Sequence, residues 1–330
     1  MIRVTCFGAT GSIPSPSRRG FDRSVVGGNT TCYFVEAGPF LVIVDMGSGA
    51  LPLGRTLFAQ YRMFDPEYKG KHVIVLLTHY HWDHIQGMPF FTPLYSVKNT
   101  FHFHGMEPRQ DPRDDSELRN KVLMMLQHQQ STPSFPLPFR ELPASKKFIA
   151  HSPMFSERAF YFFDGENLEF EMDNMGRGVN RIGPGRSDPA SFIAISTVPL
   201  NHPDNAVGYH IAHLGKSVSF IFDNENMAYP NAKIASVCKG TDMIFMDCQY
   251  DREQLSDMTQ GFGHGQIELN LAEAAAMGAK VMIASHHDPN LDDVGLGDRE
   301  VKAQKYIEEN NLKGRIGFEM AKEGDCWVID

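Results

Sequence analysis

Short apolar runs separated by glycine-containing loops form the pattern from residue 1 to about residue 100. Each run has the length of an ordinary strand and is rich in β-branched and aromatic residues, which favours strands over helices. The runs predict strands at 2–7, 32–36, 40–45 and 72–77, with a helix at 53–63 between the last two. This part of the chain is therefore expected to begin as a sheet and then to become mixed α/β.

The middle of the chain, residues 105–190, has a different character. Proline-rich and charged stretches surround a single helical pattern at 115–130, and the Gly/Arg-rich segment at 176–189 predicts a loop. We interpret residues 105–190 as an elaboration of one domain that spans residues 1–330, and not as a second domain.

Strands and helices alternate in the second half of the chain. Three strand-like runs come first, and the later runs are separated by segments of helical periodicity. Such alternation is typical of helices that cover a sheet, so the predicted fold class is α/β. The predicted strands are 192–198, 207–213, 217–222, 242–247, 280–284 and 325–329, and the predicted helices are 231–238, 266–277 and 298–310.

Composition places the chain among ordinary globular proteins. With 330 residues and 42% apolar content it can bury a large core, and no run approaches the roughly 18 apolar residues of a membrane span. Residues 1–7 predict a first strand and not a signal peptide. The five cysteines are scattered without a CxxC pair, which favours reduced thiols and a cytoplasmic location. A net charge of −9 without a basic run argues against a stable nucleic-acid partner.

The segment HYHWDH at 79–84 concentrates metal-binding side chains directly after an apolar run. In an extended segment His79, His81 and Asp83 would share one side, and a turn after Asp83 would bring His84 to join them. Imidazole and carboxylate groups suit zinc or a similar divalent ion, and four of them in six residues favour two ions over one. The alternative is a polar loop whose histidines lie at the surface.

Four further acids and histidines each follow an apolar run: Asp45, His202, Asp223 and His286. Functional residues of layered α/β folds gather where strands end and loops begin. Taken singly, such a residue is more often a turn former or a helix cap. Their recurrence alongside HYHWDH makes these four residues candidates for the same metal site.

Four motifs, in this order along the chain, resemble the metallo-β-lactamase fold. They are HYHWDH (79–84), Asn201-His202-Pro203, Phe222-Asp223-Asn224 and Ser285-His286-His287-Asp288-Pro289, and the resemblance spans most of the chain. It implies a four-layered αββα sandwich.

The resemblance also implies a ligand set for two ions. His79, His81 and His202 would bind one ion, Asp83, His84 and His286 the second, and Asp223 would bridge them. Asp45 would support the ligand loop from behind. An aspartate at the bridging position is similar to the phosphodiesterase and tRNA-processing branches of this fold, and unlike the zinc β-lactamases.

His264 stands in a glycine-flanked loop before the helix predicted at 266–277. This arrangement resembles the histidine before a helix in tRNase Z and in the cyclic nucleotide phosphodiesterases, where that histidine acts on the phosphate. Residues 7–12 and 27–31 are similar to the opening loops of phosphoribosyl cyclic phosphodiesterases. The basic arm with which tRNase Z grips tRNA has no counterpart at its usual place, since the one Gly/Arg-rich contender lies at 176–186.

The chemistry expected of such a site is hydrolysis. Two divalent ions about 3.5–4 Å apart can hold a hydroxide between them and lower its pKa, so that no catalytic serine or cysteine is needed. Attack of this bridging hydroxide on a phosphodiester develops charge where the ions lie. His264 is the candidate proton donor to the leaving alkoxide, and Asp83 is a second candidate for proton transfer.

The leading hypothesis is therefore a metal-dependent phosphodiesterase for a small or cyclic nucleotide-like diester, with Zn²⁺ or Mn²⁺ as its two ions. Asn29, Thr30, Asn205 and Asn224 are candidate substrate contacts, with turn formation as an equal alternative. The resemblance also implies a homodimer.

Three alternatives remain open. They are a tRNase Z-like endoribonuclease, a hydrolase of carboxylic esters, lactones or thioesters, and an iron redox or sensing module. The last would need a glutamate among the ligands, where this chain has Tyr80, His81 and Trp82.

Overall fold

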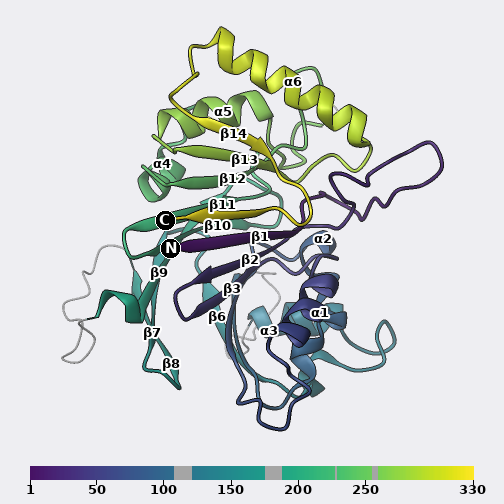
Figure 1. Ribbon diagram of the computed structural model, residues 1–330, viewed down its shortest axis with the longest axis vertical. Coiled ribbons are helices and arrows are strands. Elements are labelled where there is room, and N and C mark those ends of the chain that lie inside the picture. Colours follow the sequence, from purple (N-terminus) through teal and green to yellow (C-terminus); the bar gives the residue numbers. More distant parts are fainter. Residues whose placement is uncertain (108–120, 175–187, 227–228, 255–258) are drawn as a thin grey trace, which may run out of the picture.

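Two sheets form the centre of the molecule (Figure 1). The computed structural model describes residues 1–107, 121–174, 188–226, 229–254 and 259–330. The first sheet has the strand order β15-β1-β2-β3-β4-β5-β6, and the second has the order β14-β13-β12-β11-β10-β9-β7-β8.

The strands of the first sheet are β1 (Ile2–Gly8), β2 (Cys32–Ala37), β3 (Phe40–Val44), β4 (His72–Leu76), β5 (Thr100–Met106), β6 (Ser145–His151) and β15 (Cys326–Ile329). Those of the second are β7 (Glu157–Phe163), β8 (Leu168–Asn174), β9 (Phe192–Leu200), β10 (Ala206–His213), β11 (Lys216–Ile221), β12 (Met243–Asp247), β13 (Val281–Ser285) and β14 (Gly317–Met320). The helices are α1 (Ala50–Gln60), α2 (Trp82–Ile85), α3 (Lys121–Gln129), α4 (Ala232–Cys238), α5 (Ile267–Ala276) and α6 (Asp293–Glu309).

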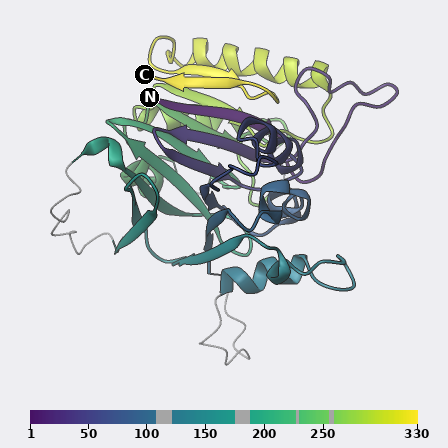
Figure 2. The ribbon, with the colours of Figure 1, turned by 60° about the horizontal axis from the view of Figure 1, so that its bottom comes forward.

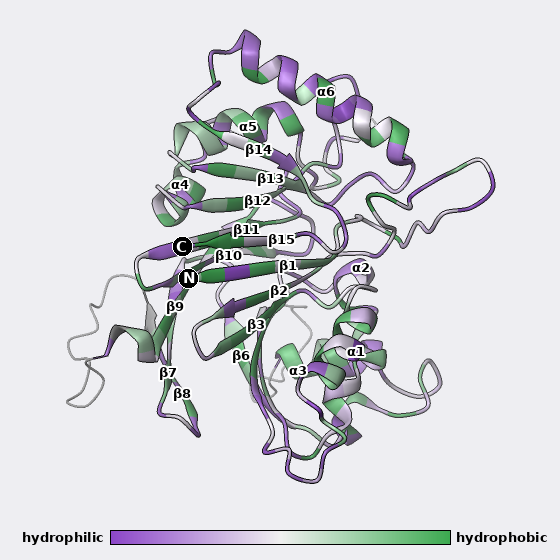
Figure 3. Ribbon diagram, in the orientation of Figure 1, coloured by the Kyte–Doolittle hydropathy of each residue, from purple (hydrophilic) through white to green (hydrophobic). Residues whose placement is uncertain are grey.

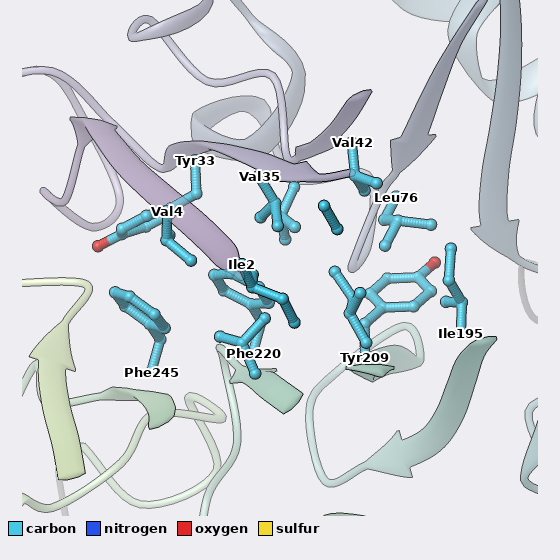
Figure 4. Packing of buried hydrophobic residues seen from close by; sticks show 14 of the residues in the cluster. Ile2, Val4, Tyr33, Val35, Val42, Leu76, Ile195, Tyr209, Phe220 and Phe245 are labelled. Carbon is cyan, nitrogen blue, oxygen red and sulfur yellow. The ribbon is translucent and has the colours of Figure 1, made fainter. Parts of the chain in front are cut away.

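The two sheets pack face to face, and their inner faces form the main core. Apolar side chains such as Val4, Val35 and Leu76 from the first sheet meet Tyr209 and Phe220 from the second (Figure 4). All five are fully buried. Burial of this apolar area is the main force that holds the sheets together.

Helices cover the outer face of each sheet. The helices α4, α5 and α6 lie on the second sheet, and α1 and α3 lie on the first (Figure 1). Figure 2 shows from a second direction that α6 is on the outside of the second sheet. In Figure 3 the strands are largely apolar while α6 carries many hydrophilic residues, as expected of a helix with one face in solvent. The α/β class and the four-layered αββα sandwich predicted from the sequence are confirmed.

Both sheets contain a parallel part that positions the site. β3, β4, β5 and β6 run parallel in the first sheet. β11, β12, β13 and β14 run parallel in the second sheet. Because the carboxyl ends of parallel strands meet at one edge, the loops that follow them are brought together.

Several predicted element bounds differ from the structure. The helix predicted at 298–310 begins earlier, at Asp293, because the Asp292 side chain accepts the backbone N–H of Gly295 at 2.9 Å and so caps the helix. The helix predicted at 53–63 is α1, which starts at Ala50 because Pro52 is tolerated in a first helical turn. The sequence analysis missed β6, β7, β8 and β14. The apolar run of β7, 159–163, has the length of a strand, whereas charged residues stand among the apolar ones of β8 and β14.

Parts of two predicted segments lie outside the described residues. These are the beginning of the helix predicted at 115–130, of which α3 is the described part, and the loop predicted at 176–189 up to residue 187. Among the described helices, none combines the length and the apolar character that crossing a bilayer requires.

Candidate metal centre

The segment HYHWDH leaves β4 and turns into the short helix α2. His81 is extended, with φ −64° and ψ 150°, and its carbonyl accepts the backbone N–H of His84 at 3.0 Å. The expectation of an extended run up to Asp83 is wrong, because the chain turns at Trp82. A helical turn at 82–85 buries Asp83 and His84 while leaving Trp82 in solvent.

Three more of the predicted residues lie beyond strand ends in an unusual backbone conformation. Asp45 follows β3, Asp223 follows β11 and His286 follows β13, and their φ angles are 59°, 49° and 54°. Residues other than glycine rarely adopt this left-handed region, and such strain tends to persist at functional sites. All three side chains are buried at the same edge of the sandwich as HYHWDH.

Ligand-type atoms converge here in three groups, of which the third, with Asp223, Asp247, His264 and His286, shares two members with the second. The first group is His79, His81 and His202, and the second is Asp83, His84, Asp223 and His286. In each group the ligand atoms lie within 4.8 Å of one another. The structure thus brings together the seven residues that the sequence proposed as ligands, and their role as ligands remains a prediction.

The carboxylate of Asp223 lies between the first two groups. Its Oδ1 is 3.1 Å from Nε2 of His84 and 3.2 Å from Nε2 of His286. Its Oδ2 is 3.6 Å from Nε2 of His79 and 3.8 Å from Nε2 of His202. Each oxygen therefore faces one group, which is the geometry a bridging carboxylate needs.

Hydrogen bonds behind the site orient its histidines. Nδ1 of His84 donates to Oδ2 of Asp45 at 2.7 Å, and the hydroxyl of Thr78 donates to the same oxygen at 2.8 Å. Nδ1 of His202 donates to the carbonyl of Gly263 at 2.9 Å. Such bonds fix the tautomer that leaves Nε2 free to bind a metal. Asp45 thus lies behind His84, where the resemblance placed it.

The charges of the site fit divalent cations. Burial would raise the pKa of Asp223, but the charges of His286 and His84 hold it well below its usual range. Burial likewise opposes ionisation of Asp83, yet the neighbouring His84 charge and hydrogen bonds keep the pKa of Asp83 well below its usual value. Burial keeps the pKa of His79 low, so its ring is neutral. Its Nε2 is buried without a hydrogen-bond partner in the described part of the chain. Burial would lower the pKa of His84 and of His286, but the neighbouring carboxylates raise both, so a divalent ion bound here would take the place of their protons. Ionised carboxylates and neutral imidazoles are the donors that Zn²⁺ and Mn²⁺ accept.

His264 lies beside the second group and is held by a residue that the sequence analysis missed, Asp247. Nδ1 of His264 donates to Oδ2 of Asp247 at 3.0 Å, and its ring stacks on His286 with centroids 5.0 Å apart. Burial would raise the pKa of Asp247, but the charges of His264 and His286 lower it to about 2. The sequence rule that identified Asp45 and Asp223 could also have identified Asp247. All three acids come at or just after the end of an apolar strand, and Asp247 is the last residue of β12.

The N-terminal loop closes one side of the centre. The backbone N–H of Ser12 donates to Oδ2 of Asp83 at 2.8 Å. Gly11 lies so close to His286 that a Cβ atom at this position would come within 2.4 Å of its Nδ1. The glycine-containing segment 7–12 therefore has a clear packing role at the centre. Above the groups of ligand-type side chains is an open cavity of about 420 Å³, lined by Ser12, Tyr80, His81, Trp82, Asp83, Asp223 and His264.

None of the four predicted substrate contacts is among the described residues that line this cavity. Asn29 hydrogen-bonds to Glu323 through its side-chain amide at 2.9 Å, and Thr30 accepts the backbone N–H of Ser48 at 2.8 Å. Asn224 accepts the backbone N–H of Asn201 at 3.0 Å, and Asn205 has a positive φ of 67° in the turn before β10. The bonds of Asn29, Thr30 and Asn224 and the turn at Asn205 give these residues structural tasks, and substrate contact remains a prediction.

Comparison with known proteins agrees with this architecture. Residues 25–187 match the family described as the Metallo-beta-lactamase superfamily. The chain carries a metallo-beta-lactamase superfamily domain, as the resemblance of its motifs predicted, and the members of this superfamily are mostly metallo-hydrolases. No curated protein matches the sequence.

Solved structures share the fold over nearly the whole chain. Unliganded yeast PDE1 has a TM-score of 0.60 at 13% identity, covering 99% of both chains. A diphosphatase from the PhnP family has a TM-score of 0.58 at 16% identity, covering 100% of this chain and 98% of its own. The short form of human tRNase Z has a TM-score of 0.56 at 14% identity, covering 99% of both. At these identities the likeness extends to the fold alone.

Proposed function

We propose that this protein is a metal-dependent phosphodiesterase that hydrolyses a small or cyclic nucleotide-like phosphodiester. The observation that carries the proposal is the position of Asp223 between two groups of ligand-type side chains, with His264 at their side. In this proposal His79, His81 and His202 hold one divalent ion, and Asp83, His84 and His286 hold the second. When bound, two such ions supply an activated water and positive charge for the phosphoryl oxygens.

The protein itself supplies the proton for the leaving group. Nδ1 of His264 is hydrogen-bonded to Asp247, so Nε2 is the ring nitrogen that can act on the substrate. The His264 side chain is 12% exposed and lines the cavity, which gives a substrate access to it. A general acid so placed protonates the alkoxide as the P–O bond breaks. Oδ2 of Asp83 already accepts the Ser12 N–H and faces His84 and His286, which favours a ligand role over a relay role.

Solved structures that share this fold include a diphosphatase from the PhnP family and a tRNase Z. This supports phosphate over carboxylic esters. The net charge of −9 favours a small diester over a whole tRNA, because a long polyanion needs a basic surface. We also propose zinc or manganese as the resident ions and a cytoplasmic location, where the five free cysteines of the structure would stay reduced.

An assay panel tests the proposal. Purified protein loaded with Zn²⁺ or Mn²⁺ is given bis(p-nitrophenyl) phosphate, 2′,3′-cyclic AMP and 3′,5′-cyclic AMP, together with a lactone, a thioester and a precursor tRNA. Turnover of one or more small diesters, lost on chelation and restored by the metal, is the expected result. Activity confined to the lactone or thioester would replace the proposal with the carboxylic ester alternative, and activity confined to tRNA would replace it with an endoribonuclease.

A further inference from the structure

Trp82 is exposed to an extent that is unusual for a tryptophan. Its exposed fraction is 77%, the highest among the large apolar side chains of the described residues. The second tryptophan of the chain, Trp327, is 8% exposed, packs edge-on against Phe245 and donates its Nε1–H to Glu319 at 2.7 Å. Tryptophan carries a large apolar surface, so an indole left in water at a functional site is a candidate for a binding surface.

The position of Trp82 is fixed by the site itself. It lies between His81 and Asp83, and it lines the cavity of about 420 Å³ above the two ligand groups. The helical turn that points Asp83 and His84 inward leaves Trp82 on the outer side, at the first position of α2. The indole is thus held at the cavity while the rest of the turn is anchored in the centre.

A second exposed aromatic side chain lies on the loop that leads to His264. Phe262 is 56% exposed and directly precedes Gly263, which packs against His202. The carboxylate of Glu225 accepts the backbone N–H groups of Gly261 at 2.9 Å and Gly263 at 3.1 Å, and so holds this loop in place. Tyr80 also lines the cavity, but it is largely buried and its hydroxyl donates to the carbonyl of Met106 at 2.8 Å. Of the tyrosine and tryptophan side chains in the described lining, Trp82 is therefore the one that leaves a face free.

We propose that Trp82 is a stacking platform for a planar ring of the substrate, and that the substrate is a phosphodiester that carries a nucleobase. The proposal rests on the proposed phosphodiesterase function, because it names the part of the substrate that lies beyond the phosphate. In this proposal the phosphate binds beside Asp223, His264 and the ions. The base stacks on the indole of Trp82, which lines the same cavity.

Stacking of this kind favours substrates that carry a planar base, but it discriminates only weakly between one base and another. Every base presents a π-face, whereas discrimination between bases needs hydrogen bonds to their edges. Beside Trp82 the described lining offers few neutral polar groups, and the Ser12 hydroxyl already hydrogen-bonds to Gln249 at 3.3 Å. The enzyme is accordingly expected to accept several bases and to prefer purines, which have the larger stacking surface.

Kinetics on two cyclic diesters test the platform. Trp82→Ala is expected to raise KM for 2′,3′-cyclic AMP by about 5- to 160-fold, the range given by loss of one stacked base, and to leave KM for glycerol 1,2-cyclic phosphate unchanged. Trp82→Phe should restore most of the affinity. The matched control is Phe64→Ala, since Phe64 is 65% exposed in the connection between α1 and β4, at the opposite end of the first sheet. An equal change for both diesters, or none for either, would overturn the proposal.

Fluorescence gives a readout that does not depend on turnover. In the Trp327→Phe variant Trp82 is the only tryptophan, and adenosine 5′-monophosphate should quench its emission whereas ribose 5-phosphate should not. If that variant does not fold, the difference between wild type and Trp82→Phe supplies the same signal. Quenching without hydrolysis of either diester would reject the phosphodiesterase function and keep the platform. Hydrolysis without quenching would keep the phosphodiesterase function and reject the platform.

Discussion

Oδ2 of Asp247 accepts two hydrogen bonds at once, from Nδ1 of His264 at 3.0 Å and from the backbone N–H of Gly265 at 2.9 Å. The pKa of about 2 keeps this carboxylate ionised at neutral pH, with burial opposed by the charges of His264 and His286. Asp247 therefore sets both the direction of the His264 ring and its tautomer.

Asp247→Asn is expected to lower kcat by about 10- to 100-fold while metal content is kept, because the amide holds His264 less firmly. Steady-state kinetics and elemental analysis of the same preparation check this. Asp247 also lies within reach of Asp223 and His286 as a candidate ligand. Loss of an ion from the variant would show that it binds metal, and would contradict the positioning role.

His264→Ala is expected to keep both ions and to lose about 100- to 10,000-fold in kcat on cyclic AMP, the usual contribution of a general acid. The loss should be much smaller on bis(p-nitrophenyl) phosphate, since p-nitrophenolate leaves without a proton. Comparison of the two substrates separates proton donation from a general structural effect. Equal losses on both substrates would contradict the role as proton donor.

Asp223→Ala is expected to lose at least one ion per chain and more than about 100-fold of activity, because both ligand groups share this carboxylate. Elemental analysis and turnover of bis(p-nitrophenyl) phosphate measure the two effects, and far-UV circular dichroism checks that the fold is intact. A folded variant with its full metal content would show that Asp223 does not bridge the ions.

Asp45→Asn is expected to weaken metal binding by about 10- to 100-fold without abolishing it. The reason is that Nδ1 of His84 loses the carboxylate that accepts its proton at 2.7 Å. Competition with a chelator at fixed pH measures the affinity, and excess zinc should restore activity. Asp22→Asn, a change at an exposed acid far from His84 in sequence, is the control and should bind metal as wild type does.

His102→Leu is expected to stabilise the fold, and more so at acid pH. His102 is fully buried on β5, and neither ring nitrogen has a hydrogen-bond partner among the described residues. Burial, with a smaller effect of the Lys147 charge, lowers the pKa of His102 to about 3. Between pH 6.5 and 3, His102 binds a proton in the unfolded chain but stays neutral in the folded chain. The free energy of unfolding of the wild type therefore falls as the pH falls through this window.

The gain from His102→Leu should therefore be about 2 kcal/mol larger at pH 5 than at pH 7, from the 1.5 pH units between pH 5 and an unperturbed value of about 6.5. Urea unfolding at the two pH values measures it. An identical gain at both would show that the folded protein protonates His102 as readily as the unfolded chain does.

The sequence by itself determined which residue types stand at which strand ends. Apolar runs of strand length predicted β1 to β4, β9 to β13 and β15, and the acids and histidines after β3, β4, β9, β11 and β13 marked the candidate centre. This worked because hydrophobic periodicity and strand-end placement are local properties of the chain. Asp247 followed the same rule at the end of β12 and was within reach of the sequence.

Only the tertiary structure decided how these residues meet. His286 Nε2 and Asp83 Oδ2 lie 3.1 Å apart although they are 203 residues apart in sequence, since the two sheets pack with their parallel strand ends at one edge. The direction of Trp82 was likewise decided by the helical turn that buries its neighbours Asp83 and His84. Contacts between distant segments depend on how the sheets pack and on where loops turn, and no local pattern of residues contains that information.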